Sequence, residues 1–272
     1  MRYLLAITEN EDAYEGLLLT ETGIVLKRQI QSEGSALFRS LLADFPVRKA
    51  AVCLSGRPFM LEAPSTWRIR KESLGEAMIR SAYGEEDGAV LVFGKRMHIA
   101  VKKRETVREI TDIPFGSAYM AEEAIRLGVT EESVWLRLAL EETASVPKGE
   151  ISEFLKKQQK ENPAKLAGLI RRGAFSGDMA CLALVKRALC AINNALFELK
   201  ATPDMPFKAF GLLREDMPVI HKGLETFWGT EISLEESKMP PVFGSVRGAV
   251  AVYKKPSDVN FHRRFSETYF LY

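Results

Sequence analysis

The sequence predicts an α/β protein with two similar lobes around a cleft. Two strand-rich stretches, residues 1–56 and 88–110, support this prediction, because each is followed by segments with helical periodicity. Between them, 84-GEEDG-88 has the polar, glycine-bounded composition of a turn and marks a domain boundary. We therefore expect an N-terminal lobe over residues 1–84, a C-terminal lobe with a helical insertion over 85–256, and a tail over 257–272.

The first 56 residues are expected to form a strand, a hairpin, a helix and a further strand. Residues 2–8 are a short apolar run typical of a core strand, and the acidic stretch 9-ENEDAYEG-16 is expected to be a polar loop. Glu21-Thr22-Gly23 separates two strand-like runs within residues 16–31 and indicates a hairpin, because glycine tolerates the positive φ of such a turn. Residues 34–45 predict an amphipathic helix, and residues 49–56 an apolar strand.

Helices dominate the remainder after the strands of residues 88–110. We expect a helix over 71–83, and the longest helix over 178–200 with Asp178 as its N-cap. One apolar stripe predicts the core-facing side of that helix: Met179, Leu182, Val185, Leu189, Ile192, Leu196 and Leu199. The other expected elements are a strand over 207–213, a helix over 216–228, a strand over 230–234 and a helix over 244–255.

Composition excludes several classes of function. The net charge is +2 without a long basic or acidic block, so nucleic acid and anionic membranes are not expected partners. The N-terminus lacks the apolar core of a signal peptide, and no apolar run reaches the roughly 18 residues of a membrane span, so we expect a cytoplasmic protein. Cys53, Cys181 and Cys190 each lie in an apolar segment and are expected to be buried free thiols.

Several short motifs occur in a familiar order. A strand at Tyr3–Thr8 precedes the hairpin, a later strand carries Gly94, and Asp112, Gly116 and Ser117 introduce a helix. Gly177-Asp178, Gly211 and Gly248-Ala249 follow. Over roughly residues 2–254 this order resembles the BadF/BadG/BcrA/BcrD-type ATPases, which include N-acetylglucosamine kinases. The resemblance implies the two-lobed, ribonuclease H-like architecture of actin-like ATPases and sugar kinases, with a central cleft for ATP, Mg²⁺ and a sugar-like acceptor.

The resemblance also assigns roles, each with a plainer alternative. Gly94, Lys95 and Gly211 would bind the nucleotide, although Lys95 with Arg96 could be surface charges and Gly211 a packing glycine. Asp112, Gly116 and Ser117 would bind the acceptor, or form a turn in which Ser117 caps the helix. Asp12, with Glu9 and Glu11, would hold Mg²⁺ or lie in a solvated loop. Glu72 would be the general base, or a first-turn helix residue.

The sequence departs from the family at the motifs that carry its chemistry. The first loop is acidic and lacks Asp-Gly-Gly-Thr, and 93-FGKRMH-98 has Lys95-Arg96-Met97 in place of Thr-Gly-Ser. The stretch 67-WRIRKESLGEAM-78 has no Asp where the family places its base, shortly after a strand. We therefore expect a weakly active or non-catalytic relative, with an active ATP-dependent sugar kinase as the alternative. Tyr269, Phe270 and Tyr272 would dock on the chain itself or on a partner subunit of a homodimer.

Overall fold

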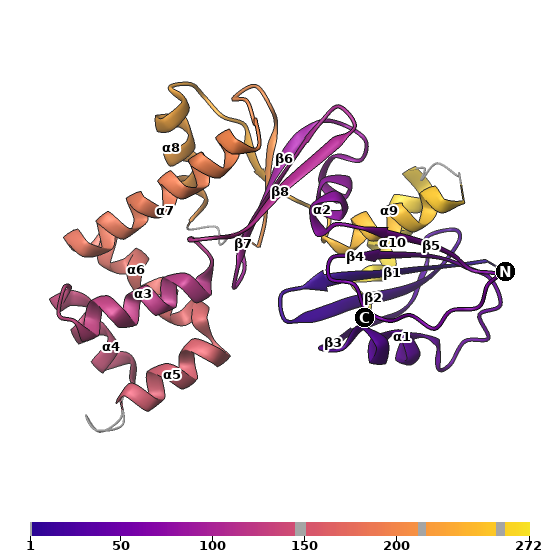
Figure 1. Cartoon of the computed structure of the whole chain (residues 1–272), viewed down its shortest axis with the longest axis horizontal. Helices are drawn as coiled ribbons and strands as arrows, with labels where there is room; N and C mark the ends of the chain where they lie inside the picture. The colour runs from indigo at the N-terminus through magenta and orange to yellow at the C-terminus, as the bar shows by residue number, and fades with distance from the viewer. Residues whose placement is uncertain (1, 145–150, 212–215, 254–258) are drawn as a thin grey trace. The chain divides into compact units, whose positions relative to one another are not determined.

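The computed structural model describes residues 2–144, 151–211, 216–253 and 259–272 (Figure 1). These residues form two compact units, each built from separate stretches of sequence. The first unit comprises Met1–Val90, Ala100–Arg108 and Glu236–Tyr272, and the second comprises Leu91–Ile99 and Glu109–Glu235. The boundaries predicted at residues 84 and 256 remain predictions, and residue 256 lies outside the described part of the chain.

The first unit contains a five-stranded sheet with strand order β3-β2-β1-β4-β5. β1 pairs antiparallel with β2 and parallel with β4, and β4 pairs parallel with β5. The carboxyl ends of β1, β4 and β5 therefore share one edge, which is where open α/β sheets bind ligands. The strands are β1 Tyr3–Asn10, β2 Ala13–Thr20, β3 Val25–Gln31, β4 Ala50–Ser55 and β5 Arg68–Glu72.

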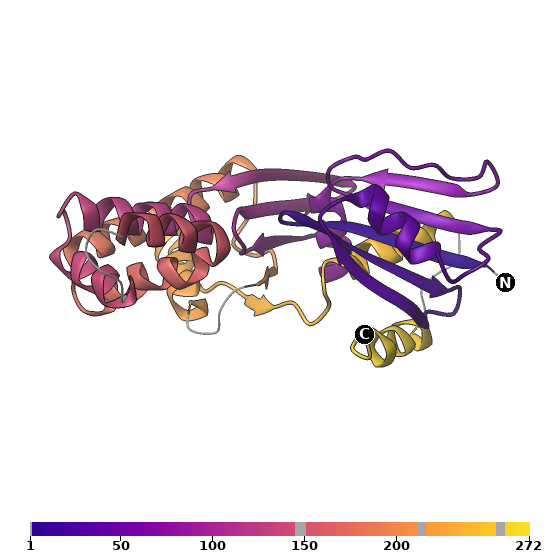
Figure 2. The ribbon, with the colours of Figure 1, turned by 90° about the horizontal axis from the view of Figure 1, so that it is seen from below.

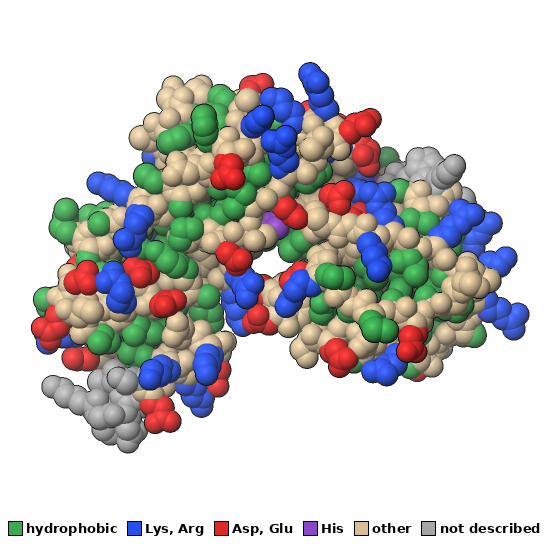
Figure 3. Space-filling model, viewed as in Figure 1, with side chains coloured by type: hydrophobic (Ala, Val, Ile, Leu, Met, Phe, Trp, Pro, Cys, Tyr) green, Lys and Arg blue, Asp and Glu red, His purple; other side chains and the backbone are tan. Residues whose placement is uncertain are grey.

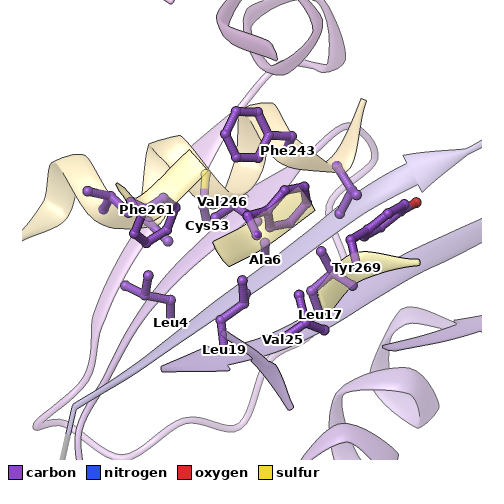
Figure 4. Packing of buried hydrophobic residues seen from close by; sticks show 14 of the residues in the cluster. Leu4, Ala6, Leu17, Leu19, Val25, Cys53, Phe243, Val246, Phe261 and Tyr269 are labelled. Atoms are coloured by element: carbon purple, nitrogen blue, oxygen red, sulfur yellow. The ribbon is translucent and has the colours of Figure 1, made fainter. Parts of the chain in front are cut away.

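Helices cover both faces of this sheet, because alternate side chains of its strands are apolar on each face. On one face α1 (Gly34–Leu42) packs against Leu5, Ile7 and Leu18. On the other face, Phe243 and Val246 of α9 (Val242–Val252) and Phe261 of α10 (Val259–Tyr269) pack over Leu4, Ala6 and Leu17 (Figure 4). α2 (Leu74–Tyr83) packs against α9.

The aromatic tail forms helix α10, which docks on the first sheet (Figure 2). The hydroxyl of Tyr269 donates to Glu15 Oε1 at 2.7 Å, and Arg28 Nε donates to the same oxygen at 2.7 Å. Burial and the nearby Glu15 carboxylate raise the pKa of Tyr269, so it stays a neutral donor. Tyr269 thus docks on its own chain, while Phe270 and Tyr272 are exposed.

A second five-stranded sheet has the order β10-β9-β6-β7-β8, and strands β6, β7 and β8 contribute residues to both units. Helices α3, α4, α6 and α7 pack around a separate apolar core in the second unit. The strands are β6 Gly88–Val92, β7 Met97–Lys103, β8 Thr106–Ile113, β9 Phe207–Phe210 and β10 Leu234–Glu236. The helices are α3 Ser117–Val129, α4 Val134–Ala144, α5 Ile151–Glu161, α6 Pro163–Phe175, α7 Met179–Glu198 and α8 Met217–Trp228.

Most strongly periodic segments have the predicted structure, but several weaker predictions are wrong. The expected loop over residues 9–16 is a tight hairpin, because β1 and β2 pair up to Asn10 and Ala13 and leave only Glu11 and Asp12 in the turn. The helix expected from residue 71 begins at Leu74, because residues 68–72 form strand β5. The strand expected over 230–234 begins only at Leu234. Residues 212, 213, 254 and 255, predicted as element ends, lie outside the described ranges.

Periodicity predicted only part of the buried face of helix α7. Ile192, Leu196 and Leu199 of the predicted stripe are buried, whereas Met179 is 75% exposed and the other three are half-buried. The buried side also includes Cys181, Leu184, Ala188, Asn193 and Ala195, which lie beside that stripe. Cys190 is exposed on the opposite side, so its predicted burial is wrong, whereas Cys53 and Cys181 are buried. Among the described residues, α7 alone is long and apolar enough to cross a membrane, and its burial in this core fits a core helix.

The crossing of α2 and α9 predicts an intolerance to a single methyl group. A Cβ on Gly244 would overlap the carbonyl oxygen of Ala77 and lie 3.0 Å from its Cα. We expect Gly244→Ala to lower the free energy of unfolding by about 2 kcal/mol or more, measured by urea denaturation. Gly168→Ala on α6 is the control: its Cβ would meet only Arg171 at 4.0 Å, so we expect a change within about 1 kcal/mol, in the stabilising direction. Equal effects of the two substitutions would contradict this packing.

Candidate functional site

Three polar side chains lie in one row at the carboxyl ends of β1, β4 and β5. Thr8 pairs with Ser55 in the strand register, and Ser55 pairs with Glu72. All three are buried, with 1%, 3% and 9% of their surfaces exposed. Buried polar groups require hydrogen-bond partners, so this row must be satisfied within the protein.

Ser245 of α9 completes the row. Its hydroxyl lies 2.5 Å from Thr8 Oγ1 and 2.6 Å from Ser55 Oγ, and Ser55 donates to Glu72 Oε1 at 2.9 Å. The four side chains therefore form one continuous chain of hydrogen bonds that ends on a carboxylate. Because Ser245 lies 237 residues after Thr8, the chain of bonds also fastens α9 to the sheet.

Glu72, the predicted general base, is held by two arginines. Arg80 Nη1 lies 2.5 Å and Arg70 Nε 2.9 Å from Glu72 Oε2, and the Glu72 side chain is 1% exposed. Burial by itself lowers the pKa of Arg80, but the Glu72 carboxylate outweighs it and raises that pKa above its ordinary value. Burial and the same carboxylate raise the pKa of Cys53. Both oxygens of Glu72 therefore accept hydrogen bonds within the protein, Oε1 from Ser55 and Oε2 from the two arginines.

Glu72 is also the last residue of β5, so the alternative that placed it in the first turn of a helix is wrong. The residue that follows is Ser73, which caps α2. Ser73 Oγ accepts from the Glu76 backbone N–H at 3.1 Å, and Glu76 accepts from the Ser73 backbone N–H at 2.8 Å. This capping box uses Glu76, the next carboxylate after Glu72, so Glu76 is not available as a base either.

The β1–β2 turn holds Glu11 and the predicted metal ligand Asp12, both exposed. Arg57, which follows β4, reaches this turn. Its Nε lies 2.5 Å from Glu9 Oε1, its backbone N–H donates to Glu9 Oε2 at 2.8 Å, and its Nη2 donates to the Glu11 carbonyl at 2.9 Å. In the described part of the chain, no group of three or more His, Cys, Asp or Glu side chains could hold a metal ion.

The turn between β6 and β7 is attached to the start of α3 in the second unit. The backbone N–H of Ser117 donates to the Gly94 carbonyl at 2.8 Å, and that of Ala118 donates to the Lys95 carbonyl at 3.0 Å. The N-cap is Gly116, without a side-chain bond, so the prediction that Ser117 caps the helix is wrong. The backbone N–H of Ser117, not its hydroxyl, contacts the turn. The turn can approach this closely because Gly116 has no Cβ, and a Cβ there would lie 2.8 Å from Arg96 Cα.

Two further predicted residues lie beside this turn. Gly211 has φ +69° and packs against the Phe93 carbonyl. The Phe93 backbone N–H donates to the Phe210 carbonyl at 2.8 Å. Asp112 has φ 60° and lies 3.5 Å from Arg96 Nε. The second unit therefore brings six predicted site residues to one turn: Gly94, Lys95, Asp112, Gly116, Ser117 and Gly211. Glu72 and Asp12 belong to the first unit.

The first N–H groups of α3 are thus already bonded to carbonyl oxygens. A free helix N-terminus attracts anions through such groups. An anion could reach the N–H groups of Ser117 and Ala118 only by displacing the turn at Gly94 and Lys95. Acidic and basic side chains are interspersed over the face seen in Figure 3, without one large area of a single sign.

Sequence reasoning missed Thr8, Ser55, Arg80, Ser245 and Arg57. Thr8, Ser55 and Ser245 are single hydroxyl residues within apolar segments. Arg80 and Arg57 resemble ordinary surface charges in sequence. Their importance comes from contacts between distant segments, such as Ser55 with Ser245. The strand register of Thr8 and Ser55 is the one signal that could have paired two of them, had the parallel strands been aligned.

The two sheets and their helices have the α/β fold of solved sugar kinases, and the predicted fold class is confirmed. A candidate N-acetylglucosamine kinase from Chromobacterium violaceum is 16% identical, with a TM-score of 0.67 over 93% of this chain and 99% of that one. A ROK family glucokinase from Streptomyces griseus, solved with glucose and AMPPNP, is 10% identical, with a TM-score of 0.56 over 93% and 100%.

A ROK family transcriptional regulator, homologous to the E. coli MLC protein, has a TM-score of 0.56 at 9% identity over 97% of this chain and 79% of that one. The fold therefore occurs in both kinases and a regulator, so it does not by itself determine an activity. No protein-family model and no curated protein sequence matches the chain.

The contacts of Glu72 predict a structural cost when its charge is removed. Glu72→Gln leaves Arg80 and Arg70 without their carboxylate, so we expect the free energy of unfolding to fall by about 3 kcal/mol. Glu62→Gln, at an exposed position, is the control and should change it by less than about 0.5 kcal/mol. Urea denaturation of the two variants measures both values. A Glu72→Gln variant as stable as Glu62→Gln would show that the carboxylate is free.

The start of α3 predicts a second contrast. Ser117→Ala should change stability by less than about 0.5 kcal/mol, because the Ser117 hydroxyl caps nothing. Gly116→Ala should cost about 2 kcal/mol, because its Cβ would press on the backbone of Arg96 and Met97. Asp178→Ala is the reference for a true cap, since Asp178 accepts from the Cys181 backbone N–H at 2.9 Å, and should cost about 1 kcal/mol. A Ser117→Ala cost equal to that of Asp178→Ala would restore the capping role.

Proposed function

We propose that this protein is a non-catalytic or very weakly active relative of sugar kinases, which binds a small ligand rather than phosphorylating it. The observation that carries this proposal is that both carboxylate oxygens of Glu72 are bonded within the protein. A base for phosphoryl transfer must accept a hydroxyl proton from the acceptor. Both Glu72 oxygens are occupied by Ser55, Arg70 and Arg80, and Ser73 and Glu76 are engaged in a cap.

The turn at Gly94 supports the same proposal. Phosphate loops of kinases offer backbone N–H groups to the triphosphate. Here the N–H groups of Ser117 and Ala118 are bonded to the turn itself, so nucleotide binding would have to break these bonds. We therefore expect ATP to bind weakly, in the millimolar range, at Gly94, Lys95 and Gly211.

The ligand we propose is a sugar-like molecule with several hydroxyl groups, bound by Asp112, Gly116 and Ser117. The glucokinase neighbour contains glucose, and the regulator neighbour belongs to the same family of proteins. We further propose that the protein is a cytoplasmic homodimer without nucleic-acid or membrane partners. Mg²⁺ at Asp12 would be required only if ATP were turned over.

An active kinase is the second candidate, and one observation favours it. Six residues that the family resemblance assigned to nucleotide and acceptor lie at one turn, although they span residues 94–211 of the sequence. Arg70, with a 37% exposed side chain, could also release Glu72 when a substrate binds.

Calorimetric titration with ATP, with and without Mg²⁺, separates the two candidates. We expect a dissociation constant of about 1 mM or weaker that Mg²⁺ does not improve, because the N–H groups at α3 are bonded to the turn. A parallel assay of phosphoryl transfer to N-acetylglucosamine, N-acetylmannosamine and glucose should give no turnover above a heat-inactivated control. Micromolar binding that requires Mg²⁺, together with transfer to any of these sugars, would establish the kinase instead.

A further inference from the structure

Arg57 bonds three oxygen atoms at the β1–β2 turn. Its Nε lies 2.5 Å from Glu9 Oε1, its backbone N–H bonds Glu9 Oε2 at 2.8 Å, and its Nη2 bonds the Glu11 carbonyl at 2.9 Å. Two carboxylate oxygens and one backbone carbonyl thus surround one cationic residue. Carboxylate and carbonyl oxygens are also the ligands that hard divalent cations such as Mg²⁺ and Mn²⁺ prefer.

The position of Arg57 is built into the fold. Gly56 has φ +96°, and a Cβ there would lie 2.5 Å from Glu9 Oε2, so only glycine lets the chain turn against the Glu9 carboxylate. The Gly56 backbone N–H is fixed by the Glu72 carbonyl at 3.2 Å. The Arg57 guanidinium also lies 5.9 Å from the ring centroid of Tyr14, a distance at which cation–π attraction adds to the ion pair.

We propose that Arg57 is a tethered counter-ion that takes the place of a divalent cation at the β1–β2 turn. The oxygens that could hold Mg²⁺ beside Asp12 are already bonded to Arg57, so the turn as it stands does not fit a metal ion. A guanidinium attached to the chain cannot leave with a nucleotide, and its presence repels a second cation at this short range. Arg57 is thus the residue that makes this turn independent of metal.

The inference deepens the proposed function, on which it rests, by naming the residue that excludes the metal of phosphoryl transfer. Its test uses no nucleotide and no sugar, so the two can fail separately. A protein that turns over ATP without binding Mn²⁺ at the turn would remove the proposed function and leave the role of Arg57 intact. A protein that binds Mn²⁺ tightly but transfers no phosphate would remove the role of Arg57 and leave the proposed function intact.

The experiment is a titration of the full chain with Mn²⁺ alone, with free Mn²⁺ measured by electron paramagnetic resonance. We expect no saturable binding by the native protein below about 1 mM. Arg57→Ala should gain a single site, with affinity at least about tenfold higher, because Glu9 and the Glu11 carbonyl lose their cation. Adding Glu9→Gln to Arg57→Ala should abolish the gain.

Arg39→Ala is the matched control, because Arg39 is exposed on α1 of the same unit and its loss changes the net charge equally. It should bind Mn²⁺ no better than the native protein. Arg57→Gln keeps most of the side-chain volume and replaces Arg57→Ala if that variant does not fold. Tight saturable binding by the native protein would overturn the proposal, as would Arg57 variants that bind no better than Arg39→Ala. If neither Arg57 variant folds, tight saturable Mn²⁺ binding by the native protein would still overturn the proposal.

Discussion

The ion pair between Glu72 and Arg80 is the interaction on which the edge of the first sheet at the carboxyl ends of β1, β4 and β5 depends. A buried carboxylate without a cation would cost several kcal/mol, so Glu72 requires Arg80 and Arg70 beside it. Once held, it orients Ser55, and Ser55 in turn orients Ser245. One carboxylate therefore fixes the positions of β4, β5, α2 and α9, which come from both ends of the sequence.

Polar groups are likewise bonded within the chain at the other places where the family resemblance implies a ligand. At the β1–β2 turn the carboxylate of Glu9 is bonded to Arg57, and at α3 the first N–H groups are bonded to the turn at Gly94. These groups therefore already have partners within the chain. Under the proposed function, these contacts stabilise the fold in place of a bound substrate, in line with the general trade-off between stability and activity.

The sequence predicted those parts of the fold that have strong local patterns. The apolar runs of β1 and β4 and the capped helix α7 follow from hydrophobic periodicity and from Asp178. Strand β5 was missed because its residues, RIRKE, carry charges typical of an exposed edge strand and lack apolar alternation. The bonds of Ser245 to Thr8 and Ser55 could not be predicted, since only tertiary packing joins residues so far apart. The roles assigned to Gly94, Lys95, Gly211, Asp112 and Asp12 remain predictions.

A double-mutant cycle between Glu72 and Arg80 tests the central claim most directly. Glu72→Gln, Arg80→Met and the double variant would be unfolded in urea under the same conditions. If the pair anchors the sheet edge, the sum of the two single losses should exceed the double loss by about 1.5 kcal/mol or more, because each single variant leaves a buried charge without its nearest partner. Losses that add to within about 0.5 kcal/mol would contradict the account, because they would show that Glu72 and Arg80 do not stabilise each other.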